Sequence, residues 1–131
     1  MKKIIFISLI LTLIISIPAF ADNTEQELQD VSAKLCEVLV QTDKTGFENM
    51  LSADSKNQMQ WWWEASGKGK YFATLYGSCK FDHIDAKSLT SADKKVFIQR
   101  FSKDGTPWSR PAPVVFIKDD SGSWKIKSYS L

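Results

Sequence analysis

The sequence has few of the residues from which catalytic and metal sites are usually built. It contains one histidine, His83, and two cysteines, Cys36 and Cys79. A structural zinc site takes four Cys or His ligands, which this set cannot supply. The chain shows no nucleophile elbow or Ser-His-Asp order, and the turn at Gly67–Lys70 lacks the Walker spacing and a preceding strand. We therefore expect neither a metal nor a cofactor.

An excess of charge of one sign is also lacking once the first residues are set aside. Residues 22–131 hold 15 acidic and 15 basic residues. Without a positive excess, nucleic-acid binding loses its electrostatic basis, and we expect no nucleic-acid partner. The charges are segregated, since residues 22–64 hold nine acids and three bases, and residues 65–131 hold six acids and twelve bases. This segregation either helps the two halves to close on each other or offers a basic surface to an acidic partner.

Long hydrophobic runs are absent except near the start of the chain. Two lysines precede an apolar run from Ile4 to Ile17, and Ala19-Phe20-Ala21 fits a small-x-small cleavage site. The run is shorter than the roughly 20 residues that cross a bilayer. The pattern predicts a signal peptide over residues 1–21, cleaved after Ala21, and a periplasmic or secreted protein with no stable membrane anchor. An uncleaved anchor is the alternative.

The predicted export bears on the state of the two cysteines. Export places Cys36 and Cys79 in an oxidising compartment, where one disulfide between them is the simplest arrangement. The two positions are 43 residues apart. In the chain-entropy model, closing such a loop stabilises a protein by roughly 3–4 kcal/mol. Two buried thiols or an intermolecular bridge are the alternatives.

Residues 24–65 show the periodicity of amphipathic helices. Thr24-Glu25-Gln26-Glu27 has the form of a capping box. In the helix that follows, the apolar residues form one stripe: Leu28, Val31, Leu35, Val38 and Leu39. Asp43 is placed to cap a short second helix, and Asp54 or Ser55 a third that ends near residue 65.

The rest of the chain indicates an antiparallel sheet. Strands are expected over residues 79–85, 95–101, 114–117 and 124–129. In the last of these, Trp124 and Ile126 face one way and the lysines between and after them face the other, so one face of the sheet is wet. Residues 107–113 hold three prolines and fit an edge or a crossing better than a central ladder position. Residues 71–76 fit a short helix or a strand.

Helices followed by such a sheet predict an α+β fold, with N-terminal helices packed on one face of a curved antiparallel sheet. Residues 114–129 read as apolar strand, acidic-Gly turn, Trp-Lys-Ile, polar residue and Tyr. With the helical layout before it, this ending resembles the NTF2-like superfamily, in particular its small exported bacterial members. The resemblance implies a cone-shaped cavity between helices and sheet. The length of residues 22–131 suits a single domain with one core. That superfamily includes enzymes, transport factors and binders, so the likeness leaves the function open.

The most unusual feature is the run Trp61-Trp62-Trp63. Three consecutive helix positions span about 200°, which is wider than a single core stripe. One of the three should therefore lie at a pocket wall or on the surface, unless the helix is wedged between other elements and buries all three. We expect Trp62 and Trp63 as binding contacts, together with Tyr71 and the Pro-flanked Trp108.

His83 is the one candidate for a catalytic histidine. In a strand, Asp82 and His83 point to opposite faces, whereas His83 and Asp85 share one. The resemblance implies a pocket Asp or His as general base in NTF2-like enzymes, and His83 or Asp85 would take that role. A surface or structural histidine is the alternative. Tyr76, Arg100 and Arg110 are further polar groups for a cavity, although no spacing selects them.

Three hypotheses for the function follow. The first is an exported, non-catalytic binding domain that uses a helix/sheet cavity or the sheet face for a small apolar ligand or a protein partner, with a homodimer through the sheet left open. The second is a periplasmic inhibitor or immunity-type protein that binds a protein partner. The third is a small NTF2-like enzyme with His83 or Asp85 as base. A roomy apolar cavity favours the first, an exposed aromatic patch with a charged rim the second, and a pocketed His83 the third.

Overall fold

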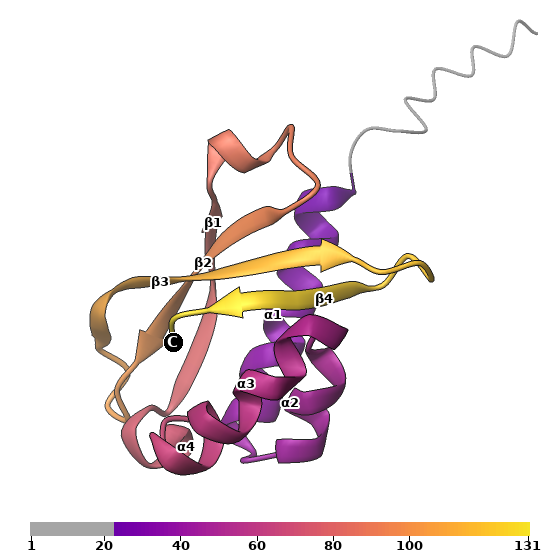
Figure 1. Cartoon of the computed structure of the whole chain (residues 1–131). Coiled ribbons are helices and arrows are strands. Elements are labelled where there is room, and N and C mark those ends of the chain that lie inside the picture. Colours follow the sequence, from indigo (N-terminus) through magenta and orange to yellow (C-terminus); the bar gives the residue numbers. More distant parts are fainter. Residues whose placement is uncertain (1–22) are drawn as a thin grey trace, which may run out of the picture.

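The computed structural model describes residues 23–131 and shows an α+β arrangement in which helices precede an antiparallel sheet (Figure 1). The helices are α1 (Thr24–Val40), α2 (Lys44–Met50), η1 (Ala53–Ser55), α3 (Lys56–Gln60), η2 (Trp61–Ala65), α4 (Phe72–Leu75) and η3 (Ala86–Ser88). The strands are β1 (Ser78–Ile84), β2 (Lys94–Phe101), β3 (Pro107–Lys118) and β4 (Trp124–Tyr129). The α+β prediction is confirmed. The expected signal peptide lies outside the described residues.

The sheet is an open meander with the order β1-β2-β3-β4, and every neighbouring pair is antiparallel. β3 begins at Pro107, earlier than predicted, and only its second half, Val114 to Lys118, pairs with β4. The proline-rich half therefore has a ladder partner only on the β2 side. Proline is tolerated there because its missing N–H costs no hydrogen bond on an unpaired edge.

The ends of the helices are set partly by local signals and partly by tertiary contacts. Asn23 takes the N-cap position of α1, so this helix begins one residue earlier than the predicted capping box places it. The Asp43 carboxylate accepts a hydrogen bond from the Gly46 N–H at 2.9 Å and caps α2 as predicted. Ser55 does not cap a helix through its side chain.

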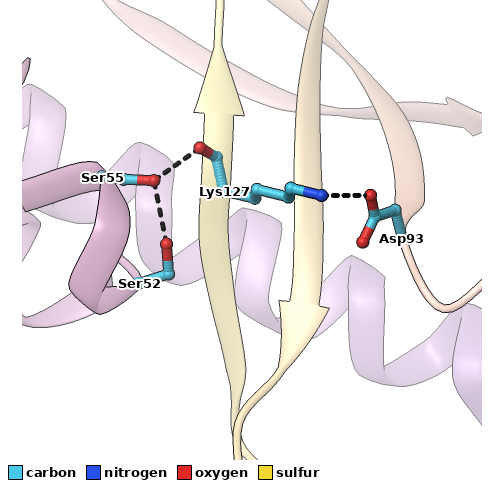
Figure 2. Close-up of polar contacts among 4 residues, drawn as sticks. All are labelled: Ser52, Ser55, Asp93 and Lys127. Carbon is cyan, nitrogen blue, oxygen red and sulfur yellow. Dashed lines mark hydrogen bonds and ion pairs between the residues drawn. The ribbon is translucent and has the colours of Figure 1, made fainter.

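Ser55 instead ties the helical half to the last strand. Its hydroxyl donates to the backbone carbonyl of Lys127 in β4 and is 2.9 Å from the Ser52 hydroxyl (Figure 2). The Lys127 side chain extends the other way and meets the Asp93 carboxylate at 2.6 Å, just before β2. Ser55 is 4% exposed. Because buried polar groups need a hydrogen-bond partner, its hydroxyl pairs with the Lys127 carbonyl instead of capping a helix.

Aromatic side chains fill the space between the helices and the sheet. Phe47 stacks on Trp62 at 5.0 Å between ring centroids, and Tyr129 meets Trp62 edge-on at 4.9 Å. Gly69 is necessary for this packing, since a Cβ atom there would lie 2.3 Å from the Trp63 ring. Such rings dominate core energetics because each buries a large apolar surface. Within residues 23–131, no helix is long and apolar enough to cross a membrane.

Candidate functional site

The two cysteines form a disulfide, as predicted. The Cα atoms of Cys36 and Cys79 are 5.4 Å apart, and the bond joins the C-terminal half of α1 to β1. The described part of the chain contains no free cysteine. A disulfide of this kind fits an oxidising compartment.

The three consecutive tryptophans are divided between surface and core. Trp61 is 63% exposed, whereas Trp62 and Trp63 are 4% and 2% exposed. Trp62 and Trp63 are therefore core residues, and the prediction that they contact a partner must be corrected. The physical reason lies in η2, a π-helix in which the Ser66 N–H donates to the Trp61 carbonyl five residues earlier, at 2.8 Å. Both inward rings pack in the core from this widened turn.

Tyr71 and Trp108, the other two predicted contacts, are both about half exposed, at 53% and 51%. They belong to a group that we call the aromatic patch, formed by Tyr71, Leu75, Tyr76 and Trp108. Leu75 lies one helical turn after Tyr71 and is also exposed. The Tyr76 and Trp108 rings meet edge-on at 5.9 Å. Exposed apolar side chains gathered in this way are typical of interaction sites.

Arg100 lies beside this patch and opposite Trp108 across the β2–β3 ladder. Its guanidinium carbon is 5.4 Å from the Tyr76 ring centroid, and Nη1 donates to the Tyr76 hydroxyl at 3.4 Å. The side chain borders a hollow of about 260 Å³, whose other lining residues are Lys68, Phe72, Leu75, Tyr76 and Leu131.

The Arg100 guanidinium is poorly partnered. No ion pair joins it to a carboxylate among residues 23–131, and its buried Nε has no hydrogen-bond partner there. A guanidinium carries five N–H donors in a planar fork that matches a carboxylate. The hollow therefore combines the apolar side chains of Phe72, Leu75 and Leu131 with a cation that is available to an acid.

A β-bulge sets the direction of Arg100 and Trp108. The ladder shifts register between Ile98 and Arg100, and Ser109 has a positive φ of 58°. The side-chain amide of Gln99, which is 8% exposed, donates to the carbonyl oxygens of Arg100 at 2.8 Å and of Trp108 and Ser109 at 3.3 Å. A non-glycine residue held at positive φ costs of order 1–3 kcal/mol, and such residues gather at functional sites. Gln99 is thus a positioning residue for the patch.

Two lysines lie next to the aromatic patch. Lys68 lines the hollow, and the Lys70 ammonium lies 5.6 Å from the Tyr71 ring centroid. These cations belong to the basic half of the sequence, and they make an acidic partner electrostatically favourable.

His83 and Asp82 are brought together, contrary to the alternation predicted for a regular strand. A register shift between Phe81 and His83 breaks the alternation, and the His83 Nδ1 lies 2.5 Å from the Asp82 carboxylate. The imidazole also stacks on Phe97 at 4.5 Å. Asp85 caps η3 by accepting from the Lys87 N–H at 3.3 Å. His83 and Asp85 do not line the hollow at Arg100. They also do not line a second, larger hollow, which lies between α1 and β1.

Sequence reasoning found part of this site. The prolines that flank Trp108 predict its exposure, whereas nothing in the sequence distinguishes Tyr76 and Arg100 from other polar residues. Gln99 and Leu75 were missed, since a buried glutamine in a strand and an exposed leucine in a four-residue helix leave no pattern in the sequence. The chain matches no family model, no curated protein and no solved structure.

Proposed function

We propose that this protein is an exported, non-catalytic binding domain that holds an acidic protein partner on the aromatic patch around Arg100. The observation that carries the proposal is the half-buried guanidinium stacked on Tyr76 without a carboxylate partner in the described residues. Trp, Tyr and Arg are the residue types most enriched at interface hot spots. A carboxylate of the partner would pair with Arg100 while its apolar neighbours cover Tyr71, Leu75 and Trp108.

Two further observations support a surface partner over the alternatives. Aromatic rings occupy the space between helices and sheet where a small apolar ligand was expected. His83 and Asp85 lie at the exposed end of β1 rather than beside Arg100, which favours binding over catalysis.

An inhibitor or immunity-type protein would use the same patch, so that hypothesis is a special case of this one. Kinship with the NTF2-like superfamily is part of the proposal, supported by the order of helices and antiparallel strands.

The experiment that tests the proposal is site-specific photo-crosslinking in the organism that makes the protein. The photoreactive residue p-benzoylphenylalanine replaces Leu75 in the patch. In a matched control it replaces Leu89, which is similarly exposed but lies before β2, outside the patch. We expect a discrete cross-linked protein from position 75 and none from position 89. Peptide mapping should place Asp or Glu next to the cross-linked segment of the partner.

A second variant checks that the patch itself is recognised. Trp108→Ala is added to the protein that carries the photoreactive residue at position 75. It should lower the yield of the cross-linked species by at least about 30-fold, because hot-spot truncations cost about 2 kcal/mol or more of binding free energy. Trp108 is exposed, so the variant should fold normally. The proposal fails if positions 75 and 89 trap the same species, if neither traps any, or if Trp108→Ala leaves the yield unchanged.

A further inference from the structure

An open groove of about 700 Å³ lies between α1 and β1, apart from the aromatic patch. One wall is a single stripe of α1: Glu25, Gln29, Ala33, Cys36, Glu37 and Val40. The other wall is formed by residues 77–82, from Gly77 into β1. The disulfide between Cys36 and Cys79 joins the two walls and holds them at a fixed separation.

The strand wall is an unpaired sheet edge. β1 pairs with β2 on one side only, and within residues 23–131 no other strand lies on its outer side. No backbone hydrogen bond from residues 78–84 leads outside the β1–β2 ladder in that part of the chain. Every second residue of such a strand presents its N–H and C=O groups outward. These groups are a template for an added strand.

The dimensions of the groove suit an extended chain. From Glu25 to Val40 the helical wall runs about 22 Å at 1.5 Å per residue. The strand wall, residues 77–82, covers about 16–20 Å at 3.3 Å per residue. A partner strand of about five or six residues has the same length. The register shift between Phe81 and His83 ends the regular edge at this point and limits the added strand to the stretch before it.

The charges on the groove select the chemistry of the occupant. Three lining residues are acidic, namely Glu25, Glu37 and Asp82, and one, Lys80, is basic. Ala33, Val40 and Phe81 are apolar. An occupant with basic side chains toward the rim and apolar side chains toward the floor complements this surface, in the alternation that a strand produces.

We infer that the groove binds an extended peptide segment with basic side chains, which adds to the outer edge of β1 as a fifth strand. This mode of recognition draws affinity from main-chain hydrogen bonds and specificity from alternate side chains. The inference does not depend on the proposed function, because the two surfaces share no residue.

The test is selection of a phage-displayed library of random nonapeptides on the intact protein, followed by calorimetry with the selected peptide. We expect enrichment of sequences that alternate Lys or Arg with apolar residues. Ala33→Tyr, which fills the groove from an exposed helix position, should lower the affinity by at least about tenfold, and Glu37→Lys should do the same. Ala53→Tyr and Asp30→Lys, at exposed positions outside the groove, should leave it unchanged.

Backbone chemistry distinguishes strand addition from simple charge attraction. N-methylation of alternate residues in the selected peptide removes donors without removing charge, and it should abolish binding in one of the two alternations. The inference is overturned if no peptide is enriched, if neither Ala33→Tyr nor Glu37→Lys weakens binding, or if both N-methylated peptides bind normally. It is also overturned if the β1 edge is closed by a second copy of the chain, seen as a dimer that Ala33→Tyr dissolves. Trp108→Ala should bind the selected peptide as tightly as the wild-type protein does, because Trp108 lies outside the groove. The peptide test can therefore succeed or fail independently of the proposed function.

Discussion

Trp61 and Trp62 are identical side chains on adjacent positions, yet their surroundings differ completely. Trp62 packs against Phe47 and Tyr129, whereas Trp61 is mostly in solvent. An aromatic side chain contributes to folding mainly through the apolar surface that it buries, so the two should have very different effects on stability.

We therefore predict that Trp62→Ala lowers the free energy of unfolding by about 3–5 kcal/mol, the usual cost of removing a large buried aromatic side chain. Trp61→Ala serves as the matched control and should change it by no more than about 0.5 kcal/mol. Urea denaturation followed by circular dichroism measures both. Equal losses in the two variants would contradict the division of the tryptophan run between core and surface.

The turn between β2 and β3 carries a carboxylate with an unusual titration. Hydrogen bonds from the Ser102 hydroxyl, and then from the hydroxyl and backbone N–H of Thr106, lower the pKa of Asp104 to about 2. The folded state therefore holds the ionised form more strongly than the unfolded chain, whose Asp pKa is about 3.9. The stabilisation is fully present above about pH 4 and is lost as the pH falls toward 2.

We predict that Asp104→Asn makes the melting temperature less dependent on pH between about pH 4 and pH 2 than in the wild-type protein. Thermal unfolding at a series of pH values measures this. Asp120→Asn, at an exposed position in the β3–β4 turn, is the control and should keep the wild-type dependence. If the melting temperatures of the wild-type protein and of Asp104→Asn changed in parallel with pH, the Asp104 carboxylate would not contribute to the acid sensitivity of the fold.

At the level of secondary-structure elements, the disulfide is what joins α1 to the sheet covalently. α1 packs along β1, and the bond closes a loop between positions 43 residues apart. Cross-linking restricts the unfolded chain and so raises its free energy relative to the folded state. It also holds the two walls of the groove together.

We predict that the double variant Cys36→Ala/Cys79→Ala lowers the free energy of unfolding by about 4 kcal/mol, as the chain-entropy model gives for this loop length. Urea unfolding of the variant and of the wild-type protein measures the difference. Wild-type protein treated with a reductant should behave like the variant. A loss below about 1 kcal/mol would mean that the unfolded chain is already restricted by other contacts.

Across the whole molecule, charge is divided between an acidic helical half and a basic sheet half. An ion pair between the Lys118 ammonium and the Glu27 carboxylate, 3.4 Å apart, joins the two halves. The Trp124 indole N–H also donates to Glu27, at 2.8 Å. Attraction between the halves should therefore add to stability, although exposed pairs contribute only about 0–1 kcal/mol each.

We predict that raising NaCl from about 0.01 M to about 0.3 M lowers the melting temperature by a few degrees, because the Debye length falls from about 30 Å to below 10 Å. Lys118→Gln should reduce this salt effect, whereas Lys34→Gln, which removes a pair within α1, should not. Differential scanning calorimetry measures the melting temperature of each protein at the two salt concentrations. A melting temperature that rises with salt over this range would mean that repulsion within each half outweighs attraction between them.

The sequence by itself determined that helices precede an antiparallel sheet, the cap at Asp43, the turns that depend on a few neighbouring residues, and the partners of the disulfide. Asp43 and the strand at residues 124–129 are of this kind, because periodicity and turn chemistry act over short stretches of chain. Only the tertiary structure decided which tryptophan faces solvent, that Asp82 meets His83, and that Tyr76, Arg100 and Trp108 come together. A π-helix and two β-bulges produce these outcomes, and each arises where packing between elements distant in the sequence outweighs local preference.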